Sequence, residues 1–167
     1  MRVKVIGKQF ATEMCFGCGK DNPIGLKGQF YNLENGKIIA LFKPGDDFQS
    51  YPQRLHGGIT AAILDEVLGR AIIAHEPDCW AVTADLSVRY KKPVPLNVDL
   101  RVVAEVTENK RRLFRCVGEL ILPDGEVAAT ASGIYMKQAL DQITDTEGVD
   151  FSRIRFKQEL DTEYFEL

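Results

Sequence analysis

The feature that most constrains the fold is one long helical pattern, at residues 57–75, that is apolar on nearly every side. Its apolar side chains are Ile59, Ala61, Ala62, Ile63, Leu64, Val67, Leu68, Ala71, Ile72 and Ile73. A helix that is apolar all round is normally a buried helix. Pro77 is expected to end it. The remaining chain must therefore supply a layer that encloses this helix.

Patterns with a period of two flank the helix on both sides in the sequence. Two strands are predicted before it, at 26–33 and 37–43, joined through Asn35-Gly36, a dipeptide typical of hairpins. Four more are predicted after it, at residues 80–90, 96–107, 112–122 and 126–137. Long consecutive strands that alternate on one face predict an antiparallel meander. The expected fold is α+β, with a sheet of about six strands around one central helix.

Alternation in the first strand after the helix divides its side chains between two faces. It places Thr83 and Arg89 on one face, and Leu86 and Tyr90 on the other.

The chain is expected to form one domain at 1–138, beginning with a lead-in loop at 1–25 and followed by an acidic tail at 139–167. A chain of 167 residues is long enough to bury a core without disulfides or metals. The tail has three basic and eight acidic side chains, a balance of −5.

The apolar residues of the tail predict a partly helical segment. Phe156, Leu160 and Tyr164 recur every four residues, and Phe165 and Leu167 follow them. This spacing favours a short helix near 156–165 that docks on the body or on a neighbouring subunit, because an isolated helix of that length is marginal in water. The alternative is a frayed, solvated tail.

Charge and hydropathy exclude several classes of partner. The net charge is −3, and without the tail the body carries +2, far less basic than a nucleic-acid-binding domain. No apolar run approaches the ~20 residues of a membrane span. The first residues lack the apolar region of a secretory leader. We therefore expect a cytoplasmic protein with no nucleic-acid or membrane partner.

The cysteines include one close pair, Cys15-Phe-Gly-Cys18. A structural zinc site usually needs a second close pair of ligands. The only histidines, His56 and His75, do not form such a pair. A redox pair of the thioredoxin type is expected at a helix start after a strand, whereas a Gly/Asn/Pro loop follows here. The favoured interpretation is a tight turn with reduced thiols packed as small apolar groups. We expect no metal.

Candidate chemistry lies at the start of the buried helix. His56-Gly57-Gly58 precedes it directly, and the first N–H groups of a helix are unpaired and favour negative charge. Such an end suits a carbonyl oxygen that becomes an oxyanion; the alternative is a glycine-rich helix start with no role.

A carboxylate follows two turns into the same helix. Asp65 lies among aliphatic residues, where a charge is costly unless it is paired or used. Asp65 is either a structural ion-pair partner or a general base or nucleophile. Glu66 suits the structural role better, because Arg70 lies four residues on.

These motifs resemble the hotdog-fold thioesterase superfamily, specifically its phenylacetate-pathway (PaaI-like) acyl-CoA thioesterases. The resemblance rests on His-Gly-Gly at the start of a buried helix and an acidic residue nine positions after the His. Residues 81–93 resemble the next strand of that family, with Thr83 at a supporting position. Residues 15–26 resemble the lead-in of one branch. The resemblance covers residues 15–137 and implies a curved antiparallel sheet around the helix.

The resemblance implies an acyl-CoA thioesterase and assigns roles to several residues. His56 belongs to the motif, and the Gly57 N–H would bind the thioester carbonyl. Asp65 would activate water or attack directly, and Thr83 would position the water or the carboxylate. Some relatives have an Asn or Gln before the His, and Gln53 is the candidate here, with Gln49 and Ser50 as other possibilities.

The resemblance also implies partners. Asp65 would face Gly57 of another subunit in a homodimer or homotetramer. No cofactor is expected beyond coenzyme A as part of the substrate. Gly58 and a basic cluster of Arg89, Lys91 and Lys92 are candidates for binding coenzyme A, because its phosphates favour cations. The alternative for the cluster is a solvated strand end.

Two other functions remain open. One is a non-catalytic module that binds acyl-CoA, since a fold does not determine function. The other is a hotdog hydratase or dehydratase, whose catalytic His and acid lie in motifs that are not evident here. Asp65 within the His-Gly-Gly helix favours hydrolysis over both.

Overall fold

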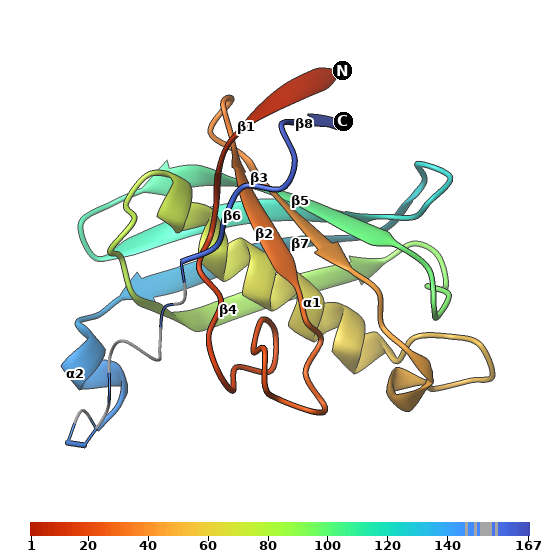
Figure 1. The fold of residues 1–167 in the computed structure, drawn as a ribbon, viewed down its shortest axis with the longest axis horizontal. Helices are drawn as coiled ribbons and strands as arrows, with labels where there is room; N and C mark the ends of the chain where they lie inside the picture. Colours follow the sequence, from red (N-terminus) through yellow and green to blue (C-terminus); the bar gives the residue numbers. More distant parts are fainter. Residues whose placement is uncertain (146, 149, 151–154, 156) are drawn as a thin grey trace.

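One helix lies on the concave side of a curved antiparallel sheet (Figure 1). The computed structural model describes residues 1–145, 147–148, 150, 155 and 157–167. The helix is α1 (Gly57–Arg70), which a short 3-10 turn, η2 (Ala71–Ala74), extends. The α+β hotdog architecture predicted from the sequence is confirmed, but the sheet has eight strands among the described residues and not about six.

The described residues form eight strands in the order β4-β7-β6-β5-β3-β2-β1-β8. The strands are β1 (Arg2–Lys8), β2 (Gln29–Leu33), β3 (Ile38–Phe42), β4 (Ala81–Tyr90), β5 (Leu100–Asn109), β6 (Leu113–Ile121), β7 (Val127–Lys137) and β8 (Tyr164–Glu166). The described residues also include two short helical segments, η1 (Asp46–Phe48) and α2 (Leu140–Ile143). All strand pairs are antiparallel.

Two parts of the predicted sheet were wrong. The meander holds only for β5, β6 and β7, because β4 pairs with β7 instead of β5. The helix carries the chain across the sheet, so the strand after it enters at the far edge. The lead-in expected to be a loop begins with β1, where Val3 and Val5 alternate inward onto a second small core.

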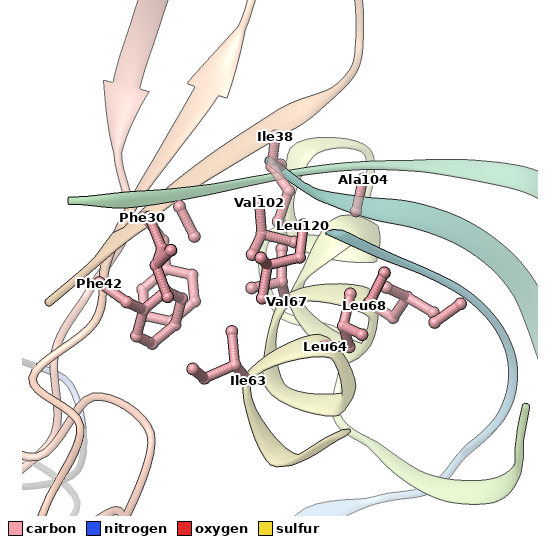
Figure 2. Packing of buried hydrophobic residues seen from close by; sticks show 14 of the residues in the cluster. Phe30, Ile38, Phe42, Ile63, Leu64, Val67, Leu68, Val102, Ala104 and Leu120 are labelled. Carbon is pink, nitrogen blue, oxygen red and sulfur yellow. The ribbon is translucent and has the colours of Figure 1, made fainter. Parts of the chain in front are cut away.

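The main core lies between α1 and the sheet (Figure 2). Ile63, Leu64, Val67 and Leu68 are fully buried on the helix. They meet side chains of the inner face of the sheet, among them Phe30, Ile38, Phe42, Val102, Ala104 and Leu120. Burying a large aliphatic side chain contributes about 1.5–3 kcal/mol, so this contact fixes the helix firmly against the sheet.

The helix predicted near 156–165 was wrong where the structure describes the tail, and Phe156 lies outside the described residues. Tyr164–Glu166 form β8, which pairs with β1. The Phe165 ring packs on Tyr31 at 5.2 Å between centroids, and Lys8 Nζ lies 2.5 Å from Asp161 Oδ2. Docking of the tail on the body is confirmed. Pairing satisfies the open edge of β1, which a local helix would not do.

Among the described residues, no helix combines the length and the apolarity that a membrane crossing requires.

Candidate active site

The N-terminus of α1 is capped by the residue that precedes it. His56 is the N-cap residue, and its Nδ1 accepts a hydrogen bond from the Gly58 N–H at 2.9 Å. Tyr90 Oη donates to the Gly57 carbonyl at 2.8 Å. Within the described part of the chain, the Gly57 N–H has no recorded acceptor. This amide is therefore available to a ligand oxygen, and His56 acts as the cap that orients it.

A hollow of about 340 Å³ opens beside this helix start. Its lining includes Gly57 and Tyr90, together with Lys91 and Lys92. Lys92 pairs with Glu126, and both lysines are exposed. Two of the three predicted basic residues thus lie next to the Gly57 amide.

Asp65 is held by hydroxyl groups from two strands. Thr83 Oγ1 donates to Asp65 Oδ1 at 2.9 Å from β4, and Tyr135 Oη donates to the same oxygen at 2.9 Å from β7. None of the described residues donates a hydrogen bond to Oδ2. The carboxylate lies in a cavity of about 270 Å³ whose wall includes Thr83, Tyr135, Trp80 and Cys15. Asp65 is therefore oriented by two hydrogen bonds and keeps one oxygen for other chemistry.

Thr83 reaches Asp65 because β4 contains a bulge. The pairing of β4 with β7 shifts register between Thr83 and Asp85. Beyond the bulge Leu86 packs on the core, and Tyr90 reaches the helix. Strict alternation would have put Thr83 on the face opposite to these residues, so the predicted division of the strand was wrong at Thr83. An extra residue in one strand reverses which face the side chains take.

Tyr135 is a site residue that the sequence analysis missed. Its ring is buried and stacks on Phe114 at 5.1 Å, and burial raises the pKa of its hydroxyl, with the Asp65 charge adding to the effect. The hydroxyl therefore stays protonated and serves as a donor to Asp65. The available signal was a tyrosine at an inward position of the last long strand, since a buried Tyr hydroxyl usually needs a partner.

Glu66 takes the structural role expected of it. Arg70 Nε donates to Glu66 Oε1 at 2.6 Å, which confirms the predicted pair. Arg70 is buried and lies over the rings of Phe10 and Phe30, at 4.9 and 4.3 Å from their centroids. The two adjacent carboxylates of α1 line the same cavity but have different partners.

The Cys15–Cys18 turn contacts this ion pair. Arg70 Nη2 lies 2.7 Å from Cys18 Sγ, and Cys15 Sγ lies 3.8 and 3.9 Å from the Glu66 carboxylate oxygens. Both cysteines are free thiols that pack on the main core, as predicted, and each has a charged neighbour in addition. The sulfurs of Cys15 and Cys18 and an oxygen of Glu66 lie within 4.8 Å of one another.

The other predicted residues lie apart from Asp65. Gln53 has φ = 63° in an exposed turn, where its N–H donates to Gln49 Oε1 at 2.9 Å. Arg89 lines a separate hollow on the outer face of the sheet with Ser87, on the side away from α1. Gly57 and Asp65 are eight residues apart on one helix, which separates them by about 12 Å along its axis. Within one chain, the Gly57 amide and the Asp65 carboxylate therefore cannot both contact the same thioester group.

The profile of the thioesterase superfamily matches residues 53–129. The matched segment spans just under half of this chain. The matched segment contains the helix start, Asp65 and Thr83, whereas Tyr135 and the cysteine turn lie outside it.

Three relatives illustrate the similarity. Mouse acyl-coenzyme A thioesterase THEM4 is 39% identical over 67 residues, which cover 40% of this chain and 28% of the mouse protein. The match thus spans well under two thirds of that relative's length. Zebrafish thioesterase superfamily member 2 has a TM-score of 0.63 at 21% identity, covering 75% of this chain and 91% of that one.

A third relative was solved with a ligand. A Streptococcus mutans protein bound to acetyl CoA has a TM-score of 0.57 at 20% identity, covering 62% of this chain and 82% of that one. At these identities the two solved structures show a shared fold.

Proposed function

We propose that this protein hydrolyses the thioester of an acyl-coenzyme A, with Asp65 as the catalytic carboxylate. The observation that carries the proposal is the fixed carboxylate: Asp65 accepts hydrogen bonds from Thr83 and Tyr135 on one oxygen, inside a cavity of a thioesterase-superfamily segment. The name of the mouse relative supports the same activity.

The chemistry requires a nucleophile and an oxyanion site. Asp65 Oδ2 would take a proton from water as the water oxygen bonds to the thioester carbon. Alternatively, Oδ2 would itself attack that carbon and form a mixed anhydride, which water then cleaves to the free acid and the Asp65 carboxylate. In both routes the C–S bond breaks, and the coenzyme A sulfur leaves as a thiolate that takes up a proton. The Gly57 N–H would donate to the carbonyl oxygen as its negative charge develops. No cofactor is needed beyond the substrate's own coenzyme A.

The site requires two copies of the chain. Since about 12 Å separates Gly57 from Asp65 along one helix, the amide must come from another subunit. The strand β4 carries Thr83, and in the described sheet only β7 pairs with it. Its free edge is suited to pairing with a second copy. We therefore propose a homodimer, or a tetramer of two dimers, with one Asp65 facing the partner's amide in each site.

Coenzyme A is proposed to bind along the hollow beside Gly57. Lys91 and Lys92 are placed to meet its phosphates there. The acetyl CoA in the Streptococcus mutans relative shows that this fold accommodates such a ligand, which supports the proposal.

A panel of acyl-coenzyme A thioesters, read by release of free thiol, tests the activity. Asp65→Asn should lower kcat by about 10² or more for any substrate found, the scale of losing a general base. Thioester binding without turnover by the unaltered protein would favour the non-catalytic binding module instead. A single turnover in ¹⁸O-labelled water tests for direct attack, because water that opens the resulting anhydride at the Asp65 carbon places the label in the Asp65 carboxylate, whereas direct attack by water never does.

A further inference from the structure

The proposed hydrolysis makes no use of the turn at Cys15–Gly19, although this turn forms part of the cavity that holds Asp65. Cys15 lies in the cavity wall. The Gly19 N–H donates to the Cys15 carbonyl at 2.7 Å and closes the turn. A Cβ at Gly19 would lie 2.4 Å from that carbonyl oxygen, so only glycine permits this closure. The turn brings the two sulfurs together next to the helix.

The turn is docked on a buried cation. Arg70 donates to Cys18 Sγ at 2.7 Å and to Glu66 at 2.6 Å, and Thr12 Oγ1 lies 3.3 Å from Cys18 Sγ. Gly17 permits this docking, because a Cβ there would lie 2.6 Å from the Glu66 side chain. The guanidinium contacts the sulfur of Cys18, whereas the Cys15 sulfur lies 3.8 and 3.9 Å from the Glu66 carboxylate oxygens, whose charge opposes a thiolate at Cys15. The stabilisation of a Cys15 thiolate, the reactive form of cysteine, must therefore come from Cys18.

The two cysteines differ in access. Cys15 is half-buried and faces the cavity, whereas Cys18 is buried, with 3% of its surface exposed. The hydrogen bond from the Cys18 thiol lowers the pKa of Cys15 to about 6, and sharing that proton raises the pKa of Cys18. An accessible thiolate beside a buried thiol is the arrangement in which one sulfur reacts first and the other follows.

We propose that Cys15 and Cys18 form a reversible dithiol–disulfide site in the wall of the Asp65 cavity, with a hydroperoxide as the oxidant. The Cys15 thiolate attacks one oxygen of the hydroperoxide; an S–O bond forms, the O–O bond breaks, and the departing oxygen takes up a proton. The Cys18 thiol then attacks the Cys15 sulfenic acid; the S–S bond forms, the S–O bond breaks, and water leaves with the Cys18 proton. Two thiols are oxidised and one hydroperoxide is reduced. The proposal does not depend on the thioesterase activity.

A metal ion is the less favoured occupant of this cluster. Three donor atoms come together among the described residues, whereas structural zinc uses four. Arg70 already donates to two of those three groups, Cys18 and Glu66. A divalent cation would have to lie against a buried guanidinium, which costs free energy.

The test compares two cysteines of the same cavity in the reduced, full-length protein. Cys79 also lines the cavity and is also half-buried, but burial raises its pKa. Peptide mass spectrometry after timed iodoacetamide treatment at pH 7 should show Cys15 alkylated at least about tenfold faster than Cys79. In a separate, unalkylated sample, hydrogen peroxide should lower the mass of the peptide or peptides that carry Cys15 and Cys18 by two hydrogens. Dithiothreitol should restore the original mass.

Two variants separate the site from general oxidation. Cys79→Ser should still form the Cys15–Cys18 link, whereas Cys18→Ser should instead give a Cys15 sulfenic acid that dimedone traps. Equal alkylation of Cys15 and Cys79, peroxide treatment without a Cys15–Cys18 link, or one zinc ion per chain shielding Cys15 from alkylation would each overturn the proposal. The measurements on the unaltered chain decide the question even if a variant fails to fold.

Discussion

Tyr135 binds Asp65 twice through one hydroxyl group, lying 2.9 Å from the carboxylate Oδ1 and 3.1 Å from the backbone carbonyl of the same residue. This contact joins β7 to the third turn of α1. It orients the Asp65 carboxylate and also ties the helix backbone at Asp65 to β7. Tyr135 is therefore a positioning residue for the proposed reaction.

Removing this hydroxyl should reduce turnover. Tyr135→Phe keeps the stacked ring but deletes a hydrogen bond to a charged group, worth about 1.5–3 kcal/mol. We expect kcat to fall by about tenfold or more while KM changes little. Tyr31→Phe is the matched control, because the Tyr31 hydroxyl binds Gln29 on the other face of the sheet. Unchanged kcat in folded Tyr135→Phe would remove Tyr135 from the site.

Lys91, which follows β4, and Arg89, on the outer face of β4, should differ in their effect on the KM for substrate. Lys91→Ala should raise KM for an acyl-coenzyme A several-fold, because Lys91 lies beside Gly57. It should leave KM unchanged for a short acyl thioester that lacks the nucleotide phosphates. Arg89→Ala, on the outer face, should leave both KM values unchanged. A larger effect from Arg89→Ala than from Lys91→Ala would place coenzyme A on the outer face instead.

The C-terminal strand should contribute to stability. Phe165 packs on Tyr31, so Phe165→Ala should lower the free energy of unfolding by about 1–2 kcal/mol for a partly buried ring. The melting temperature should then fall by about 2–8 °C. Leu160→Ala is the control, since Leu160 is half exposed. Equal melting temperatures for the two variants and the unaltered chain would mean that β8 adds nothing to stability.

Replacing Cys18 should change the pH dependence of Cys15 alkylation. Alkylation proceeds through the thiolate, so its rate rises with pH through the pKa of Cys15, at about 6. Cys18→Ala removes the thiol donor that stabilises the thiolate, and the midpoint should move upward toward an ordinary cysteine value of about 8.5. Cys79→Ala should leave the midpoint in place. A midpoint that stays near 6 in Cys18→Ala would show that Cys18 is not the cause.

Local patterns were sufficient to predict much of this fold. The apolar run at 57–75 and the alternating segments after it predict the helix and most strands, because burial and the strand pleat impose those periods directly. The ion pair of Glu66 with Arg70 follows from helical spacing in the same way.

The remaining features depend on contacts that periodicity does not report. The bulge after Thr83 reverses one side chain through backbone pairing with β7, and β8 forms only because β1 presents an open edge. Tyr135 meets Asp65 from 70 residues away, and Cys18 meets Arg70 from 52. Such partners are selected by tertiary structure, and spacing along the chain cannot identify them.

The central claim, that Asp65 of one subunit acts with the Gly57 amide of another, is tested most directly by mixing two inactive variants. Gly57→Pro removes the N–H at the first helical position, where proline is tolerated, and His56 already has extended backbone, φ −63° and ψ 134°. Gly57→Ala keeps the N–H and should stay active.

Asp65→Asn and Gly57→Pro should each be nearly inactive alone, and co-refolding equal amounts should restore about a quarter of the wild-type rate, because half of randomly paired dimers contain one intact site. Mixed dimers that form but recover no activity would contradict the shared site.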